Sequence, residues 1–163
     1  IKDLKLHLIT SDAAHRVKMA ENFQAQMANY GITVSVEFMQ QAALIDRLET
    51  DKSVEMFVLS WTPGMNADYM YRNPIHSKGG RSFYANLNDP EIDALIDAAA
   101  AEVDSAKRAE MYEELQIRLT TEIIPWVPIA QATLTMGAAK GVTGLLLHPG
   151  LVHQFKTAEK IIN

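Results

Sequence analysis

The sequence predicts an α/β fold with a mixed, largely parallel sheet flanked by helices. Apolar and polar residues alternate over residues 2–10 and again over 32–38, which is the period of half-buried strands. A third, mostly apolar run over residues 54–60 is typical of a central strand. Segments with helical spacing separate these three runs. The order strand, helix, strand, helix, strand predicts parallel strands joined by helical connections.

The two helices of this first part are expected over residues 12–30 and 40–50. Asp12 is a plausible N-cap of the first helix, and Gly31 stands where a left-handed residue would end it. The residues whose helical spacing predicts these two helices are Val17, Ala20, Phe23, Met27, Tyr30, Ala43, Leu44, Ile45 and Leu48.

Two further helices are expected in the second half of the chain. Asp89 followed by Pro90 is a typical helix start, because aspartate caps the first turn and proline suits its first position. Asp104 is expected to cap the other helix, which ends near Glu122. Their predicted buried faces are Ile92, Leu95, Ile96 and Ala99, and then Met111, Tyr112, Leu115 and Leu119. Residues 125–130 and 133–136 are predicted to be strands in a hairpin-like return.

Residues 61–81 follow the third strand. Their apolar residues show neither helical nor strand spacing, and the segment is predicted to form an ordered loop exposed on one rim. A loop of this length in a compact domain is usually functional. It begins at the carboxyl end of a strand, where ligands bind in open α/β sheets. Its two methionines, Met65 and Met70, suit an adaptable binding surface, or alternatively pack the loop against its own domain. They lie beside three aromatic residues, Trp61, Tyr69 and Tyr71.

Composition excludes several classes of protein. The chain has 163 residues, 48% hydrophobic, with a formal net charge of −5, which is enough for one compact domain. No apolar run approaches the ~20 residues of a membrane span. The acidic balance without a cluster of basic residues argues against nucleic-acid binding. Because there is no cysteine, disulfide scaffolds and thiol catalysis are excluded. Since residue 1 is Ile1, we expect a processed or partial chain.

Catalytic and metal-binding motifs are lacking, so we expect no metal, no cofactor and no enzymatic activity. The five histidines form no H-E-x-x-H pair, and no nucleophile elbow, phosphate-binding loop or dinucleotide fingerprint occurs. The alternative is an α/β enzyme in which Asp68 and His76 act as acid and base, although most such pairs in a loop are solvated. A receiver domain would need acidic residues at the end of the first strand, where Thr10 and Ser11 stand.

Four segments carry a family resemblance: ENFQAQMANYGITVSVE, FVLSWTPGMNADYMYRNPIHS, SFYANLNDPEIDALIDAA and AKRAEMYEELQIRLTTEIIPWVPI. In this order they resemble the C-terminal lobe of the peptide/nickel family of solute-binding proteins that serve ABC importers. The resemblance runs from Leu4 to about Phe155. It implies one lobe of a type II periplasmic-binding-protein-like fold over residues 1–163, with the N-terminal partner lobe absent. The ligand is then expected in a cleft between two lobes that close over it.

The resemblance also implies the site residues. The expected cleft wall comprises Trp61, Thr62, Pro63, Gly64, Met65, Asn66, Asp68 and Tyr69, with Arg72 and Arg81 as partners for ligand carboxylates. Several peptide-binding members have an aspartate at the position of Gly64, where it pairs with the peptide's α-amine. Here Asp68 is the candidate for that role, since other branches carry the same Ala67-Asp68-Tyr69 step.

The implied partners are a peptide or other small solute, the permease subunits and the missing lobe, with no nucleic acid. Oligopeptides, dipeptides, glutathione-like compounds and metal chelates remain open as ligands. The implied location is periplasmic or at the cell envelope, with lipid anchoring open. We expect the isolated lobe to bind ligand poorly, because half of the cleft is absent.

Overall fold

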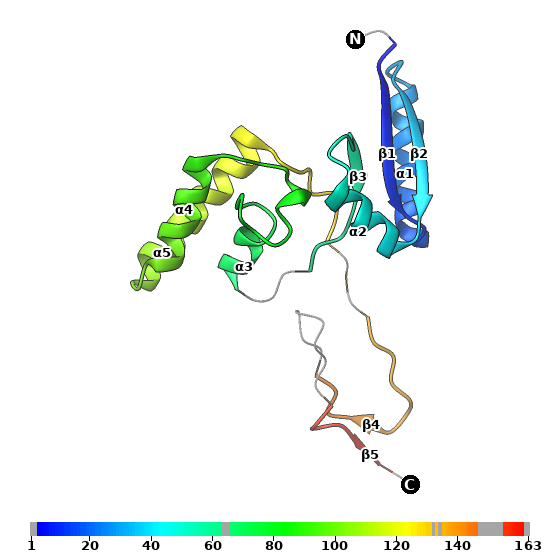
Figure 1. Ribbon diagram of the computed structural model, residues 1–163. Coiled ribbons are helices and arrows are strands. Elements are labelled where there is room, and N and C mark those ends of the chain that lie inside the picture. Colours follow the sequence, from blue (N-terminus) through cyan, green and yellow to red (C-terminus); the bar gives the residue numbers. More distant parts are fainter. Residues whose placement is uncertain (1–2, 63–65, 132, 134, 147–154, 162–163) are drawn as a thin grey trace.

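The computed structural model describes residues 3–62, 66–131, 133, 135–146 and 155–161. Its first part alternates strands and helices, its second part is helical, and a last segment extends away from both (Figure 1). The first part contains β1 (Lys5–Ser11), α1 (Ala14–Ala28), β2 (Thr33–Met39), α2 (Gln41–Thr50) and β3 (Met56–Val58). The second part contains α3 (Ala67–Arg72), a 3-10 turn (Ser82–Tyr84), α4 (Pro90–Ala101), α5 (Ser105–Arg118) and a π-helical turn (Leu119–Ile123). The last segment contains β4 (Val142–Thr143) and β5 (Glu159–Lys160).

The three strands of the first part form a parallel sheet in the order β2-β1-β3. The central strand is therefore β1. The prediction of a central strand over residues 54–60 is wrong, because among the described residues β3 pairs with β1 alone. In β1, Leu8 packs in one cluster with Ala20 of α1, while Ile9 packs in another with Leu44 of α2. Two successive side chains thus face opposite covered sides of the sheet, as expected of a parallel sheet.

The first helix is shorter than predicted at both ends, although Gly31 has the predicted conformation. Gly31 has a φ of +74°, the left-handed conformation expected after the helix. At the other end the N-cap is Ala13, which has no capping side chain, so the prediction for Asp12 is wrong. The Asp12 N–H donates to the Met39 carbonyl at 2.9 Å, which keeps this residue in line with the strands. Tyr30 is 74% exposed because the helix has already ended before it.

The helical part has its own apolar core, which confirms the predicted buried faces of α4 and α5. Its fully buried members come from both helices and from the connection before them: Ile75, Ile92, Ile96, Leu115 and Leu119. Both predicted caps are confirmed. The Asp89 carboxylate accepts from the Glu91 N–H at 2.9 Å, and the Asp104 carboxylate accepts from the Ala106 N–H at 2.9 Å.

Residues 61–81 are more regular and more buried than the sequence predicts. α3 lies within them, capped by the Asn66 side chain, which accepts from the Asp68 N–H at 2.9 Å. Six residues are too few to display a helical period, which explains why the pattern missed this helix. Pro74, Ile75 and His76 are buried, so the prediction of a rim-exposed loop is wrong for this stretch.

The predicted strands 125–130 and 133–136 are not found in the part of them that the structure describes. Instead β4 and β5 form a two-residue antiparallel pair further along the chain. Val127 and Ile129 are 75% and 64% exposed. Strand-like sequence alone does not make a strand, because its backbone groups need a neighbouring edge to pair with. Among the helices that the structure describes, none is both long and apolar enough to cross a membrane.

Candidate functional site

Three aromatic side chains meet beyond the carboxyl end of β3. The Trp61 ring stacks on Tyr69 of α3, with centroids 5.8 Å apart and planes inclined by 16°. It also meets the Tyr84 ring edge-on at 5.8 Å and 80°. The Trp61 Nε1 atom is buried and has no hydrogen-bond partner among the described residues. We call Trp61, Tyr69 and Tyr84 the aromatic cluster; Tyr69 is 46% exposed and gives it an outward face.

Arg81 is attached to this cluster through Tyr84. Its Nη1 donates to the Tyr84 hydroxyl at 2.9 Å, and its guanidinium lies 5.6 Å from the centroid of the same ring. Thr62 is exposed beside Trp61, and Asn66 caps α3. The predicted site residues Pro63, Gly64 and Met65 lie outside the described residues. The structure thus connects Tyr69 to Trp61, Trp61 to Tyr84 and Tyr84 to Arg81. The sequence prediction did not single out Tyr84.

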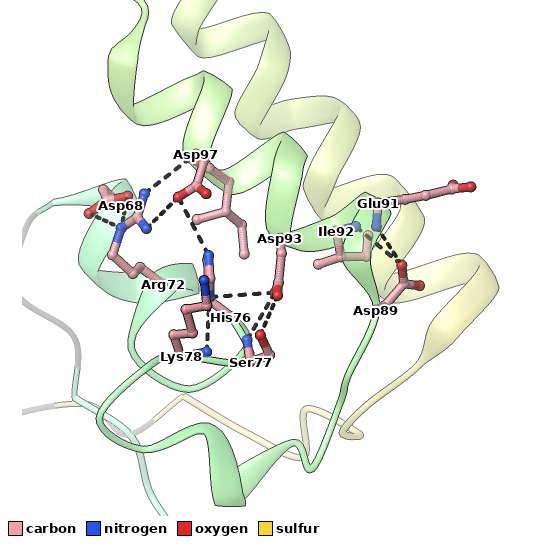
Figure 2. A network of polar contacts seen from close by, with 11 residues as sticks. Asp68, Arg72, His76, Ser77, Lys78, Asp89, Glu91, Ile92, Asp93 and Asp97 are labelled. Atoms are coloured by element: carbon pink, nitrogen blue, oxygen red, sulfur yellow. Dashed lines mark hydrogen bonds and ion pairs between the residues drawn. The ribbon is translucent and has the colours of Figure 1, made fainter.

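Arg72 and Asp68 form an ion pair in α3 that extends to α4 (Figure 2). The Arg72 Nε donates to both Asp68 oxygens at 3.0 and 3.1 Å, and its Nη1 donates to Asp97 at 2.7 Å. The hydrogen bond from Arg72 lowers the pKa of Asp97, and the same contact raises the pKa of Arg72. Both predicted site residues therefore already have charged partners within this chain.

His76 is 5% exposed and lies beside two other carboxylates (Figure 2). Its Nδ1 accepts from the Lys78 N–H at 3.0 Å and lies 3.5 Å from an Asp93 oxygen. Its Nε2 lies 3.4 Å from an Asp97 oxygen. Among the described residues no ion pair joins His76 to Asp68, whose carboxylate is held by Arg72. The alternative of an Asp68/His76 acid–base pair is therefore not supported, and His76 fastens the end of α3 to α4.

The other aromatic of this region, Tyr71, packs inward. Its ring stacks on Tyr112 of α5 with centroids 5.9 Å apart, and both side chains lie against the core of the helical part. Tyr71 therefore holds this segment against the helical part of the chain.

An open cavity of about 730 Å³ lies between the start of α3, the end of α4 and the start of α5. Asn66 and Asp68 line one side, and Arg108 and Tyr112 line the other. Burial raises the pKa of Tyr112, and Arg108 donates to the Glu102 carbonyl at 3.0 Å. The cavity places Asn66 and Asp68 on a concave surface. The described residues hold no group of three potential metal-ligating side chains.

Comparison with known proteins agrees with this fold. No protein-family model matches the chain. A curated relative is di/tripeptide-binding protein 4 of Pseudomonas aeruginosa, 25% identical over 142 residues, which cover 85% of this chain and 26% of that protein. The chain thus spans about a quarter of this relative's length.

Two solved structures show the same fold. The dipeptide-binding protein from Pseudoalteromonas sp. SM9913, in complex with Met-Leu, matches with a TM-score of 0.77 and 22% identity over 98% of this chain and 33% of its own. An ABC transporter-associated periplasmic binding protein from Helicobacter pylori, in complex with the peptide STSA, matches with a TM-score of 0.65 and 19% identity over 78% of this chain and 25% of its own.

The chain has the fold of a part of these two binding proteins, which confirms the predicted α/β class. In sequence the chain is similar to a di/tripeptide-binding protein, which confirms the family resemblance that its motifs predicted. All three of these proteins are binding proteins rather than enzymes.

Proposed function

We propose that residues 1–163 form the C-terminal ligand-binding lobe of an extracytoplasmic solute-binding protein of an ABC importer. The lobe captures peptides in a cleft that it shares with an N-terminal lobe, and the closed protein delivers them to the permease. Its location is the periplasm or the cell envelope, and it catalyses no reaction. Ligand contacts that exist only in the closed form would shift the hinge equilibrium toward the form that the permease recognises.

The observation that carries this proposal is the convergence of Trp61, Tyr69 and Tyr84 beyond the carboxyl end of β3. Ligands of open α/β sheets bind at this edge. Aromatic faces bury the apolar parts of variable side chains, while neighbouring polar groups fix orientation. The similarity to a di/tripeptide-binding protein supports peptide as the ligand class. Asn66, Asp68 and the cavity beside them offer polar surface for the remainder of the ligand.

The proposed cleft wall keeps the predicted residues. It comprises Trp61, Thr62, Pro63, Gly64, Met65, Asn66, Asp68 and Tyr69, with Arg72 and Arg81 at its margin. Since Asp68 and Asp97 already neutralise Arg72, Arg81 is the better placed of the two arginines to meet a ligand. Asp68 would meet a ligand amine only by sharing its carboxylate with Arg72.

A tryptophan fluorescence titration of the intact two-lobed protein with a peptide library tests this proposal. We expect a saturable change with at least one class of peptide, and loss of that change in Trp61→Phe. Trp126→Phe is the matched control, because Trp126 packs against the core of the helical part. No response to any peptide, together with a response to another solute such as a metal chelate, would overturn peptide as the ligand. Calorimetry showing equal affinity for the lobe and the intact protein would contradict a shared cleft.

A further inference from the structure

The buried ring of His76 lies between α3 and α4 and shares a carboxylate with Arg72 (Figure 2). Its Nε2 lies 3.4 Å from an Asp97 oxygen, and the Arg72 Nη1 donates to the same oxygen at 2.7 Å. Its Nδ1 accepts from the Lys78 N–H at 3.0 Å and lies 3.5 Å from an Asp93 oxygen. Each ring nitrogen of His76 therefore faces a carboxylate of α4.

The Nδ1 atom of His76 can serve one of its two neighbours at a time. The Lys78 N–H needs an acceptor, which the unprotonated nitrogen provides, whereas the Asp93 carboxylate needs a donor, which the protonated nitrogen provides. In the neutral ring Nδ1 therefore bonds Lys78, and the hydrogen lies on Nε2, facing Asp97. A proton taken up at Nδ1 would break the hydrogen bond with Lys78 and place a charged donor beside Asp93.

The charges around the ring favour such a proton, although burial opposes it. Among the described residues, Asp93 has His76 as its one basic partner within ion-pair distance. Arg72 instead pairs with Asp68 and Asp97. A charged His76 would thus complete a row of alternating charges that runs from α3 to α4. In the part of the chain that the structure describes, no hydrogen bond or ion pair joins the ring to the side chains of the other titratable groups nearby: Lys78, Glu91, Arg108, Tyr112 and Arg118.

A charged His76 would act on Asp68, a residue of the proposed cleft wall, through Asp97 and Arg72. A charged donor forms stronger hydrogen bonds than a neutral one, so the charged ring would hold Asp97 more tightly. Asp97 is already shared, because the hydrogen bond from Arg72 and then that from His76 lower its pKa. Arg72 would rely more on Asp68, whose two oxygens its Nε contacts at 3.0 and 3.1 Å. Asp68 would then be less available to an amine of the ligand.

We propose that His76 is a positioning residue: a proton on its ring draws Asp97 away from Arg72 and thereby withdraws Asp68 from the ligand. Peptides with a free α-amine would bind more weakly as the pH falls through the range in which histidine takes up a proton, ordinarily about pH 8 to 5. This inference deepens the proposed function, and it rests on that function for peptide as the ligand and for the place of Asp68 in the cleft wall.

The test is calorimetry on the intact protein with one peptide at about pH 7 and about pH 5. We expect the wild type to lose roughly fivefold in affinity, the low end of the usual coupling between sites, because the Asp97 side chain is 60% exposed. His76→Asn keeps an acceptor for the Lys78 N–H and takes up no proton, so most of this loss should disappear. Titration of the peptide itself is equal in both proteins and cancels in the comparison.

His7→Asn is the matched control, because His7 also lies beside a carboxylate, that of Glu37 at 3.1 Å, but on the sheet. This variant should keep the loss of affinity, and the same peptide with an acetylated amine should show the loss in neither wild type nor variant. An equal loss in wild type and His76→Asn, or an equal loss for the acetylated peptide, would overturn the inference while leaving peptide binding intact.

A second measurement needs neither a ligand nor a folded variant. In NMR spectra of the intact wild-type protein, the ring of His76 and the backbone amide of Lys78 should shift together between about pH 8 and pH 5, with one midpoint, as their hydrogen bond is lost. Should no peptide bind, the proposed function fails, and a joint shift still supports the exchange of partners at Nδ1 independently of peptides. A ring that does not change over this range, or a Lys78 amide that does not follow the ring, overturns the inference.

Discussion

Replacing Ile75 by alanine tests whether the segment after α3 is anchored in the core. Ile75 is fully buried against Ile92, Ile96 and Leu115, although the sequence places it in a loop. The substitution removes three buried carbons, worth about 0.8 kcal/mol each, or about 2.4 kcal/mol in transfer free energy. A residual cavity adds to this, and measured losses for such changes are about 2–5 kcal/mol. We expect a loss of about 3 kcal/mol in the free energy of unfolding.

Urea unfolding followed by circular dichroism measures this loss, and thermal unfolding should show a midpoint lower by roughly 6–12 °C for a chain of this size. Ile117→Ala is the matched control, because Ile117 lies on α5 but is 52% exposed. We expect the control to lose less than about 1 kcal/mol, since surface substitutions are usually small in effect. A loss below about 1 kcal/mol for Ile75→Ala would refute the burial of this segment and, with it, the fixed position of Tyr69 relative to Trp61.

Three further predictions concern caps, close packing and charge. Asp89→Ala should lower the free energy of unfolding by about 1 kcal/mol, because Asp89 caps α4. Asp12→Ala should change it by less than about 0.5 kcal/mol, because Asp12 does not cap α1. Urea unfolding of the two variants measures both changes. Gly79→Ala should strongly lower the free energy of unfolding, because the added Cβ would collide with the Arg72 backbone oxygen. At Gly137 an added Cβ meets nothing within 4 Å, so Gly137→Ala should be nearly neutral in the same assay. Asp97 has a folded pKa below its unfolded value, so its stabilising contribution is present above about pH 4 and is lost as the pH falls through the folded pKa. Asp97→Asn should therefore be less stable than the wild type at about pH 6 and equal to it near pH 2; a constant difference across this range would contradict the ion pair.

The sequence predicted the parts of the fold whose causes are local. The caps at Asp89 and Asp104 need only residues two or three positions away, and the left-handed Gly31 follows directly from the end of its helix. The order of the strands in the sheet depends on contacts between distant residues and was not predicted correctly. β1 alternates apolar and polar residues and β3 is wholly apolar, yet β1 is the central strand, with α1 and α2 packed on its opposite sides.

The candidate site was predictable in part. Trp61, Tyr69 and Arg81 follow from the aperiodic segment after β3 and from the family resemblance. Tyr84 could have been found within the SFYANL stretch that carried one of the resembling motifs, but its meeting with Trp61 depends on the chain returning after α3. The burial of Arg16 on α1 left no signal in the sequence, because one arginine in an amphipathic helix is ordinarily a solvated residue.

Two features of the structure are unfavourable in the isolated lobe: exposed apolar side chains and a buried arginine. Val127 and Ile129 belong to a segment with the sequence of a strand, yet the structure leaves them exposed, since the described residues offer that segment no edge to pair with. Arg16 has the burial of a paired cation, and among the described residues no carboxylate forms an ion pair with it. Exposed apolar strand sequence is unfavourable in water, and an unpaired buried charge is unfavourable inside a protein. A second lobe would cover the exposed apolar side chains of this segment, as the proposed function requires.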